Sequence, residues 1–234
     1  MAHQRIMQRL AKWHIWLGWL VGVPVVMWTV TGLIMTIKPM DEVHGDHLRK
    51  DVAETALPRD TQIAVALPSD STAPVRSVLT QVERGETVTR ITYMDGTSER
   101  FRADGRKMSP LSEVEARLIV DQHIHGGDRV VSTARFDADS TPFDFRRPVP
   151  VWQVVLEDGT HVYVGTETGR IEAVRTEWWR TFDFVWGLHI MDLETREDTS
   201  HPILILFALL SVIGSIFGCV LMFRRRKARK ATVA

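Results

Sequence analysis

The stretch WHIWLGWLVGVPVVMWTVTGLIMTI, residues 13–37, decides the architecture of this chain because its 25 residues include no Asp, Glu, Lys or Arg. At about 1.5 Å per helical residue, such a segment can cross a hydrocarbon core of roughly 30 Å. A second apolar run, from Ile203 to Phe223, has the same property. A buried helix of a soluble protein can also be apolar on every side, but it seldom runs this far without a charge. The sequence therefore predicts two transmembrane helices.

Basic residues flank the two runs on the sides nearest the chain ends. Arg5, Arg9 and Lys12 precede the first run, and the tail RRRKARK at residues 224–230 follows the second. The positive-inside rule then predicts that both termini are cytoplasmic, in a bacterial inner (plasma) membrane, and that residues 39–201 lie in the periplasm. The first run is too long for the apolar region of a cleaved signal peptide, which indicates an uncleaved anchor.

The whole-chain composition hides this division. A formal net charge of zero, with 44% apolar and 25% charged residues, is ordinary for a soluble protein. Polar and turn-forming residues near Leu57 to Pro74 indicate a connector before a small α+β domain. The expected segments are a first transmembrane region, a connector, a periplasmic domain, an interfacial aromatic segment, a second transmembrane helix and a basic tail, at residues 1–38, 39–73, 74–175, 176–201, 202–223 and 224–234.

The predicted periplasmic domain contains an internal repeat. Residues 93–106, YMDGTSERFRADGR, align with residues 156–170, LEDGTHVYVGTETGR, when one inserted residue is allowed. The Asp-Gly pairs at 95–96 and 158–159 are typical of hairpin turns between alternating strands. The repeat predicts a duplicated unit that contains strands in both halves.

Each half of the repeat is expected to begin with a helix. The two candidate helices cover Pro74–Arg84 and Pro110–His123, and the second opens with Ser112 and Glu115 in capping-box spacing. The predicted fold class is therefore membrane α with periplasmic α+β. Two antiparallel transmembrane helices flank a duplicated domain of a helix and an antiparallel sheet.

The outer domain offers little catalytic chemistry by sequence. No nucleophile, base and orienting group stand at a spacing that favours a hydrolase. His123 and His125 are a candidate metal-binding pair, but an H-x-H pair followed by glycines is more often a solvated helix end. Cys219 is the only cysteine and lies in the second apolar run, so no disulfide is expected.

Residues 148–171, PVPVWQVVLEDGTHVYVGTETGRI, resemble the PepSY domain, a periplasmic helix-and-sheet module that often occurs twice in a chain. Residues 12–20, KWHIWLGWL, together with Thr31-Gly32, resemble the first helix of PepSY-associated transmembrane proteins. GLHIMD at 187–192 and GCVLMFRRR at 218–226 resemble their last helix. That family includes siderophore-iron reductases that carry b-type haem on helix histidines, so the resemblance implies transmembrane electron transfer.

The chain departs from larger family members because it has two predicted spans rather than four or more. It also shows no flavin, nicotinamide or iron–sulfur fingerprint. The resemblance therefore implies a subunit of a ferric reductase or another oxidoreductase complex, rather than a self-contained reductase.

His14 and His189 are the candidate axial ligands of haem b iron. Gly18 and Gly22 follow His14 at i+4 and i+8, so the three residues share one helix face where a porphyrin can approach. His189 lies on the outer side, across roughly 30 Å of bilayer from His14. The two histidines therefore cannot ligate one iron. The second ligand of each would come from a symmetry mate, a partner protein, or locally from His44, His47 or His201.

Plainer interpretations stand beside haem ligation. His14 can be an interfacial histidine next to Trp13 and Trp16, and His189 can be a polar helix cap. The glycines also fit simple helix packing, because two G-x-x-x-G stripes lie at matching membrane depth, at residues 18 and 22 and at residues 214 and 218.

The preferred function is a haem-b membrane subunit that passes electrons across the inner membrane, for siderophore-iron reduction or within a respiratory redox complex. Membrane lipid, a second copy or a larger membrane complex, and a redox partner protein are the expected partners, and nucleic acid is not. The alternative is a non-catalytic subunit that binds or regulates a periplasmic or membrane partner.

Overall fold

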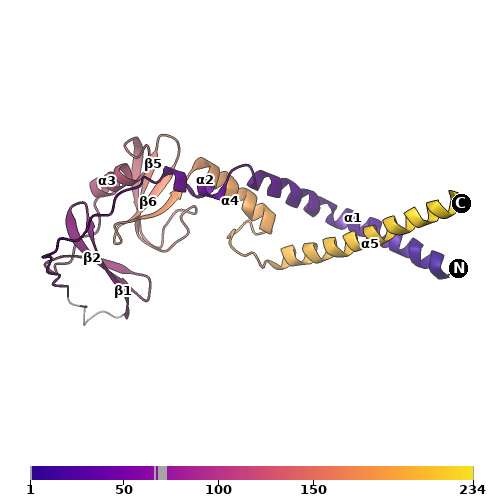
Figure 1. Cartoon of the computed structure of the whole chain (residues 1–234), viewed down its shortest axis with the longest axis horizontal. Coiled ribbons are helices and arrows are strands. Elements are labelled where there is room, and N and C mark those ends of the chain that lie inside the picture. The colour runs from indigo at the N-terminus through magenta and orange to yellow at the C-terminus, as the bar shows by residue number, and fades with distance from the viewer. Residues whose placement is uncertain (1, 66, 68–72, 234) are drawn as a thin grey trace. The chain divides into compact units, whose positions relative to one another are not determined.

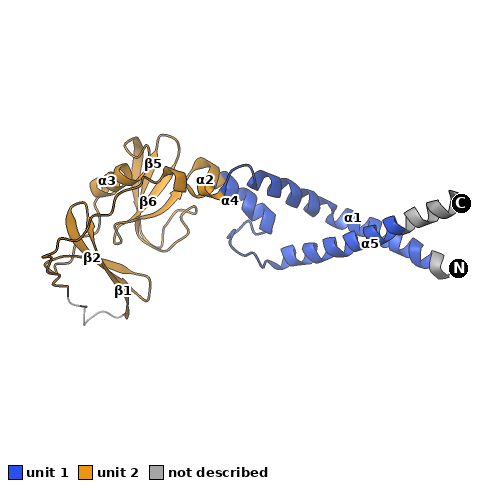
Figure 2. Cartoon of the chain, viewed as in Figure 1, with its two compact units in different colours: residues 1–39, 181–234 blue, residues 40–180 orange. Residues whose placement is uncertain are grey.

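The computed structural model describes residues 2–65, 67 and 73–233 and divides the chain into two compact units. The first unit combines residues 1–39 with residues 181–234, and the second covers residues 40–180 (Figure 2). The first unit is helical, and the second is built on two antiparallel sheets (Figure 1).

Two long antiparallel helices, α1 (Ala2–Met35) and α5 (Pro202–Val233), form most of the first unit (Figure 1). The segments Arg5–Met35 and Pro202–Phe223 are long and apolar enough to cross a membrane, and few of their residues are buried in the protein. The core helix of a soluble protein would instead be mostly buried, so this exposure favours membrane spans. The prediction of two apolar helices that are long enough to span a membrane is confirmed.

The less exposed residues of α1 and α5 recur at alternating intervals of three and four, which defines a seam on each helix. Such spacing keeps one stripe of each helix facing its partner, as in a coiled coil. The α1 seam consists of Leu10, His14, Leu17, Val21, Pro24, Trp28 and Thr31, and the α5 seam consists of Leu204, Phe207, Ser211, Gly214, Gly218 and Leu221.

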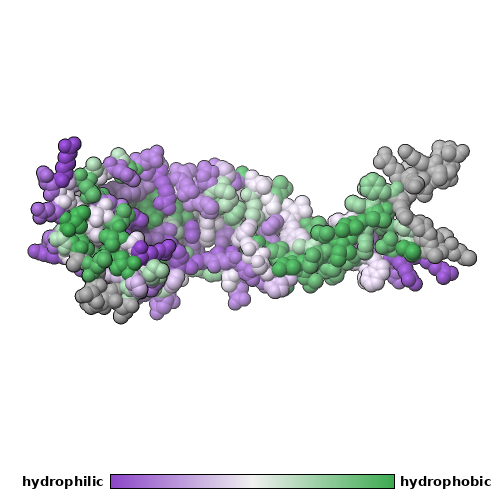
Figure 3. All heavy atoms as spheres, turned by 60° about the horizontal axis from the view of Figure 1, so that its bottom comes forward, coloured by the Kyte–Doolittle hydropathy of each residue, from purple (hydrophilic) through white to green (hydrophobic). Residues whose placement is uncertain are grey.

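The outward faces of the two helices are apolar (Figure 3). Trp13, Trp16 and Trp19 are all exposed near the start of the first span, close in sequence to Lys12. Indole rings prefer the boundary between hydrocarbon and headgroups, where one edge of the ring can meet water. This distribution is the one expected of a helix pair surrounded by lipid.

The first sheet of the second unit has three antiparallel strands in the order β1 (Val75–Glu83), β2 (Glu86–Tyr93) and β3 (Ser98–Arg102). The helix expected over Pro74–Arg84 is therefore wrong. Arg84 and Gly85 both have positive φ, 52° and 82°, and form a tight turn between the paired residues Glu83 and Glu86. A turn of that shape matches the twist of a β-hairpin. The residues before the turn therefore pair with β2 as a strand.

The composition of β1 also favours a strand. Its β-branched residues, which pack well on a pleated surface, are Val75, Val78, Thr80 and Val82. Thr80 shares a hydrogen bond of 2.8 Å with Thr89 on β2, as cross-strand threonines commonly do.

The second sheet has four antiparallel strands in the order β4 (Val130–Phe136), β5 (Val151–Leu156), β6 (His161–Gly165) and β7 (Ile171–Arg175). Helix α3 (Glu113–His123) packs on one face, where Ile119 and Val120 join a core with Val154 and Val162. Phe145, from the loop between β4 and β5, is buried against Tyr163 in a separate core cluster. Two short helices, α2 (Met40–His44) and η1 (Asp46–Leu48), precede both sheets.

The predicted start of α3 is confirmed. The Ser112 hydroxyl accepts from the Glu115 N–H at 3.4 Å, and the Glu115 carboxylate accepts from the Ser112 N–H at 2.9 Å. This capping box satisfies N–H groups that the first helical turn leaves without intrahelical partners.

The aligned repeat corresponds to two similar hairpins. Asp95 and Asp158 each accept the N–H of the threonine two residues later, at 2.9 Å in both cases. The following glycines, Gly96 and Gly159, have positive φ. The two halves differ in what precedes them, because a helix comes before the second sheet and a strand takes that place in the first.

Candidate functional site

His14 lies on the α1 seam and points at α5. Its Nδ1 atom is 3.0 Å from the carbonyl oxygen of Gly214. A carbonyl oxygen can only accept, so Nδ1 carries the proton in this bond, and in an imidazole with a single N–H the Nε2 atom then keeps its lone pair. A polar side chain held this way within a spanning helix is a functional candidate, because ionisable groups are costly in a membrane interior.

Gly218 provides the space for the His14 ring. A methyl group at Gly218 would lie 3.0 Å from His14 Cε1 and 3.4 Å from Nε2, closer than side chains normally approach. A methyl group at Gly214 would lie 3.8 Å from the Cβ atom of Leu17, which is ordinary contact. The α5 glycines thus let α1 and its imidazole approach closely.

Gly18 and Gly22 do not share this contact. A methyl group added at either position would meet nothing within 4 Å. His14 is one of the α1 seam residues that face α5, whereas Gly18 and Gly22 lie beside the seam. The close approach of helices that the sequence suggested for both stripes is made by the α5 glycines only.

His189 lies near the end of α4 (Glu177–Ile190), whose residues 181–190 belong to the first unit. Its Nδ1 atom is 2.8 Å from the hydroxyl oxygen of Thr31 on α1. The Trp28 indole N–H donates to the His189 carbonyl oxygen at 2.9 Å. Trp186, one turn earlier on α4, stacks beside the ring with centroids 6.5 Å apart. His189 is therefore held by α1 and by its own helix together.

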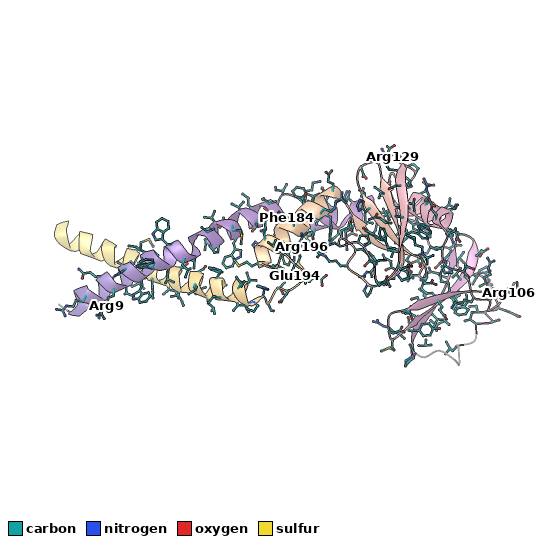
Figure 4. The ribbon with its side chains drawn as sticks, turned by 180° about the vertical axis from the view of Figure 1, so that it is seen from behind. Arg9, Arg106, Arg129, Phe184, Glu194 and Arg196 are labelled. Carbon is teal, nitrogen blue, oxygen red and sulfur yellow. The ribbon has the colours of Figure 1, made fainter. Side chains whose placement is uncertain are left out.

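The loop after α4 is tied back to that helix. Arg196 donates to the buried carboxylate of Asp183 at 2.6 Å, and its guanidinium lies 5.5 Å from the centre of the Phe184 ring (Figure 4). The close approach requires Gly187, because a methyl group there would lie 2.7 Å from Arg196 Cγ and 2.9 Å from the Asp192 carbonyl oxygen.

Asp192 organises the same loop. Its carboxylate accepts the backbone N–H groups of four loop residues and the Thr195 hydroxyl; the four are Glu194, Thr195, Glu197 and Asp198. The bond from the Thr195 hydroxyl, with the backbone N–H groups, holds the pKa of Asp192 well below its usual range. The charged Asp192 therefore fixes the chain two residues beyond Ile190, where α4 ends.

The two histidines are far apart. Thr31, the partner of His189, lies about 25 Å along α1 from His14 at 1.5 Å per residue. Both contacts are on the α1 seam, so both imidazoles face the interior of the helical unit at different levels. One iron cannot reach both rings, as the sequence indicated.

The other predicted ligands have different surroundings. His44 ends α2 and His47 lies in η1, both in the second unit. His201 precedes α5, and its Nδ1 atom is buried without a hydrogen-bond partner in the described chain. Among described residues, no group of three or more His, Cys, Asp or Glu side chains could hold a metal ion. His123 donates from Nδ1 to the Ile119 carbonyl oxygen at 2.9 Å, as a residue at a helix end does.

The second unit holds a polar cluster of its own on β6. The Asp144 carboxylate accepts from the Tyr163 hydroxyl at 2.5 Å and meets His161 Nδ1 at 3.0 Å. Burial alone would raise the pKa of Asp144, but the bonds from His161 and Tyr163 outweigh it and lower that pKa. Burial and the nearby Asp144 charge raise the pKa of Tyr163. The cluster holds the β4–β5 loop on the sheet.

Sequence reasoning found the two histidines but missed Trp28 and the role of Thr31. Both residues fall on the same three-and-four spacing as His14, which is the signal that could have placed them. The contact with α4 could not be inferred, because α4 is separated from α1 by the whole second unit.

The imidazole rings of His14 and His189 and the glycines beside them fit part of what a haem site needs, namely nitrogen ligands for iron and small neighbouring residues. In each ring Nδ1 is within hydrogen-bond distance of an oxygen, and Nε2 makes no hydrogen bond to a described residue, as in a metal-binding histidine held by an orienting partner. Glycine lies against His14, and a methyl group at Gly32 would lie 3.7 Å from His189 Cε1.

Comparison with known proteins agrees with the membrane arrangement. The family described as the PepSY-associated TM region matches residues 11–233. No curated protein and no solved structure matches the chain. The match covers most of the first spanning helix, the whole of the second and everything between them, so this chain belongs to the PepSY-associated transmembrane family.

Proposed function

We propose that the chain is a haem-b-binding membrane subunit for transmembrane electron transfer, in siderophore-iron reduction or a respiratory redox complex. The observation that carries the proposal is the matched state of His14 and His189. The Nδ1 atom of each ring lies within hydrogen-bond distance of an oxygen of the helical unit, at 3.0 Å for His14 and 2.8 Å for His189, an arrangement that would leave Nε2 for a metal. A b-type haem would supply a one-electron iron couple there, and the chain's residues would hold and orient it.

The proposal places both termini in the cytoplasm of a bacterial cell and the second unit in the periplasm. Because α1 and α5 are antiparallel, Arg5, Arg9 and Lys12 lie at the same end of the helix pair as the basic tail. The positive-inside rule assigns that end to the cytoplasm. His14 then lies near the inner face and His189 near the outer face, as an electron path across the membrane requires.

Each haem needs a further axial ligand or an open position. In the proposal a second copy of the chain or another membrane subunit provides it, and His201 is the local candidate on the outer side, since its Nδ1 atom is buried without a partner in the described chain. A periplasmic redox partner would bind the second unit.

A reduced-minus-oxidised absorbance spectrum of the full-length protein, purified after expression with added haem, tests the proposal. We expect a Soret change that His14→Ala and His189→Ala each reduce by about half and that the double variant abolishes. His125→Ala is the matched control, because His125 is exposed in the second unit. A featureless spectrum, or full haem content in the double variant, would sink the proposal.

A non-catalytic role is the second candidate, and the edge of the first sheet favours it. Val78 and Leu79 are exposed on β1, the outer strand of the three. Exposed edge strands can pair with another chain. Two results together would support this role. The purified chain would show no haem spectrum, and a protein partner that co-purifies with it would be lost in the Val78→Lys variant.

A further inference from the structure

Thr31 is almost completely buried, at 4% exposure, whereas its neighbour Val30 is half exposed, at 50%. Its hydroxyl is 2.7 Å from the Met27 carbonyl oxygen, one turn earlier, and 3.2 Å from that of Trp28. A hydroxyl has one proton, and both of these neighbours are acceptors. The proton is therefore committed to the α1 backbone.

The Thr31 oxygen can then only accept from His189. The 2.8 Å contact between Thr31 Oγ1 and His189 Nδ1 requires the proton of that bond to reside on Nδ1. A neutral imidazole has a single N–H, so Nε2 has none. In His14 the acceptor for the Nδ1 proton is the backbone carbonyl oxygen of Gly214, whereas in His189 it is the side-chain hydroxyl of Thr31.

The surroundings of His189 leave Thr31 as the group that selects the tautomer. The Trp28 indole N–H donates to the His189 backbone carbonyl, and the Trp186 indole N–H donates to the Arg196 carbonyl oxygen at 3.1 Å, so neither bonds a ring nitrogen. The Asp183 carboxylate is occupied by Arg196, and the Asp192 carboxylate by its own loop. No other hydrogen bond to the ring is present in the described chain.

We propose that Thr31 is the positioning residue that sets the Nδ1–H tautomer of His189 and so makes its Nε2 atom able to bind iron. The proposal rests on the proposed function for its purpose, but the tautomer itself does not depend on haem. Outer partners of metal-bound histidines typically change metal affinity about 10- to 100-fold, by fixing the ring and raising its basicity.

Thr31→Val and Thr31→Ser separate this role from packing. Valine keeps the branched shape without the oxygen, and serine keeps the oxygen. Thr29→Val is the matched control, because the Thr29 hydroxyl makes the same kind of bond to the Val25 carbonyl at 2.8 Å on an exposed face. Thermal unfolding of each variant verifies that the helical unit is intact.

The test uses the haem-free full-length protein, labelled with ¹⁵N-histidine in detergent micelles, with His189→Ala assigning the resonance. We expect a protonated Nδ1 for His189 in the wild type, Thr31→Ser and Thr29→Val, and a mixture or a protonated Nε2 in Thr31→Val. An unchanged tautomer in folded Thr31→Val, or a protonated Nε2 in the wild type, would overturn the proposal.

Haem titration of the same proteins forms the second arm. We expect Thr31→Val to weaken the His189-dependent site about 10- to 100-fold, with Thr31→Ser close to wild type. If the wild type binds no haem, the proposed function fails while the tautomer measurement still decides the role of Thr31. If haem binds and Thr31→Val binds it equally well, the positioning role fails alone.

Discussion

The Nδ1 atom of His14 lies 3.0 Å from the carbonyl oxygen of Gly214, across the seam between the first and last helices of the chain. The bond joins residues 200 positions apart in sequence. It places an imidazole inside the helix pair, where a lone polar group would otherwise lack a partner. The register between α1 and α5 is therefore a property that experiments can address directly.

A pair of introduced cysteines should report that register. The Cβ position at Gly214 is 3.8 Å from that of Leu17, which equals the mean Cβ separation of about 3.8 Å in disulfides. We expect Leu17→Cys with Gly214→Cys, in a Cys219→Ser background, to form an intramolecular disulfide seen as a gel shift without a dimer band. Gly18→Cys with Gly214→Cys is the control, because Gly18 has open space around its Cβ position. Equal cross-linking of the two pairs would contradict this register.

Enlarging Gly218 should separate the helices at His14. A side chain there begins 3.0 Å from His14 Cε1, and overpacking of this kind costs about 1–3 kcal/mol. We expect Gly218→Leu to slow disulfide formation in the Leu17→Cys, Gly214→Cys protein described above. Gly22→Leu is the comparison, since its Cβ position meets nothing within 4 Å and both changes replace glycine in a helix. No difference in disulfide rate would show that Gly218 does not seat the ring.

The attachment of the first sheet should depend on Arg90. Its buried guanidinium donates to Glu83 at 2.5 Å and to the Thr168 carbonyl oxygen in the β6–β7 turn at 2.8 Å. Removing it leaves Glu83 in a partly buried position without its cation, at a cost of about 3 kcal/mol. We expect Arg90→Ala to lower the urea midpoint of the β-sheet circular dichroism signal.

Arg102→Ala is the control for Arg90. Arg102 lies 3.4 Å from Glu86 in a pair whose side chains are both more than half exposed, at 54%. Such pairs contribute about 0–1 kcal/mol because water screens them. Equal midpoints for the two variants would show that the Arg90 contacts do not stabilise the second unit.

The second unit should lose stability in acid through Asp144. Its pKa in the folded chain lies below the ordinary value of about 3.9, because bonds from His161 and Tyr163 favour the carboxylate. The stabilisation is therefore complete above that ordinary value and is lost as pH falls toward the lower folded pKa. We expect Asp144→Asn to be less stable near pH 7 and to show a flatter decline below about pH 4, measured by thermal unfolding. An unchanged acid profile would contradict the assignment.

Local physical chemistry made several features of the fold predictable. Ser112 and Glu115 cap α3 because each side chain bonds to the other's backbone within one turn. Asp158 and Gly159 form a turn because the aspartate bonds two residues ahead and glycine accepts positive φ. The helix expected over Pro74–Arg84 was wrong because the Arg84-Gly85 turn and the pairing of this segment with β2 favour a strand.

The candidate site was predictable only in its histidines. His14 was singled out through the resemblance to PepSY-associated transmembrane proteins and through the glycines that follow it at i+4 and i+8. Gly18 and Gly22 share its face by spacing, yet the ring meets Gly218 on the other helix. Spacing along one helix says which residues share a face, but it does not say which of two glycine stripes receives a partner.

By itself, the sequence determined that the chain has two apolar segments of spanning length, because that property follows from the absence of charge over a sufficient number of residues. Only the tertiary structure decided that His189 donates to Thr31 and His14 to Gly214. These bonds depend on how α1, α4 and α5 pack, and that packing brings together residues 158 and 200 positions apart. The proton position on each ring follows from its partner oxygen, so the chemistry of the two histidines is a tertiary property.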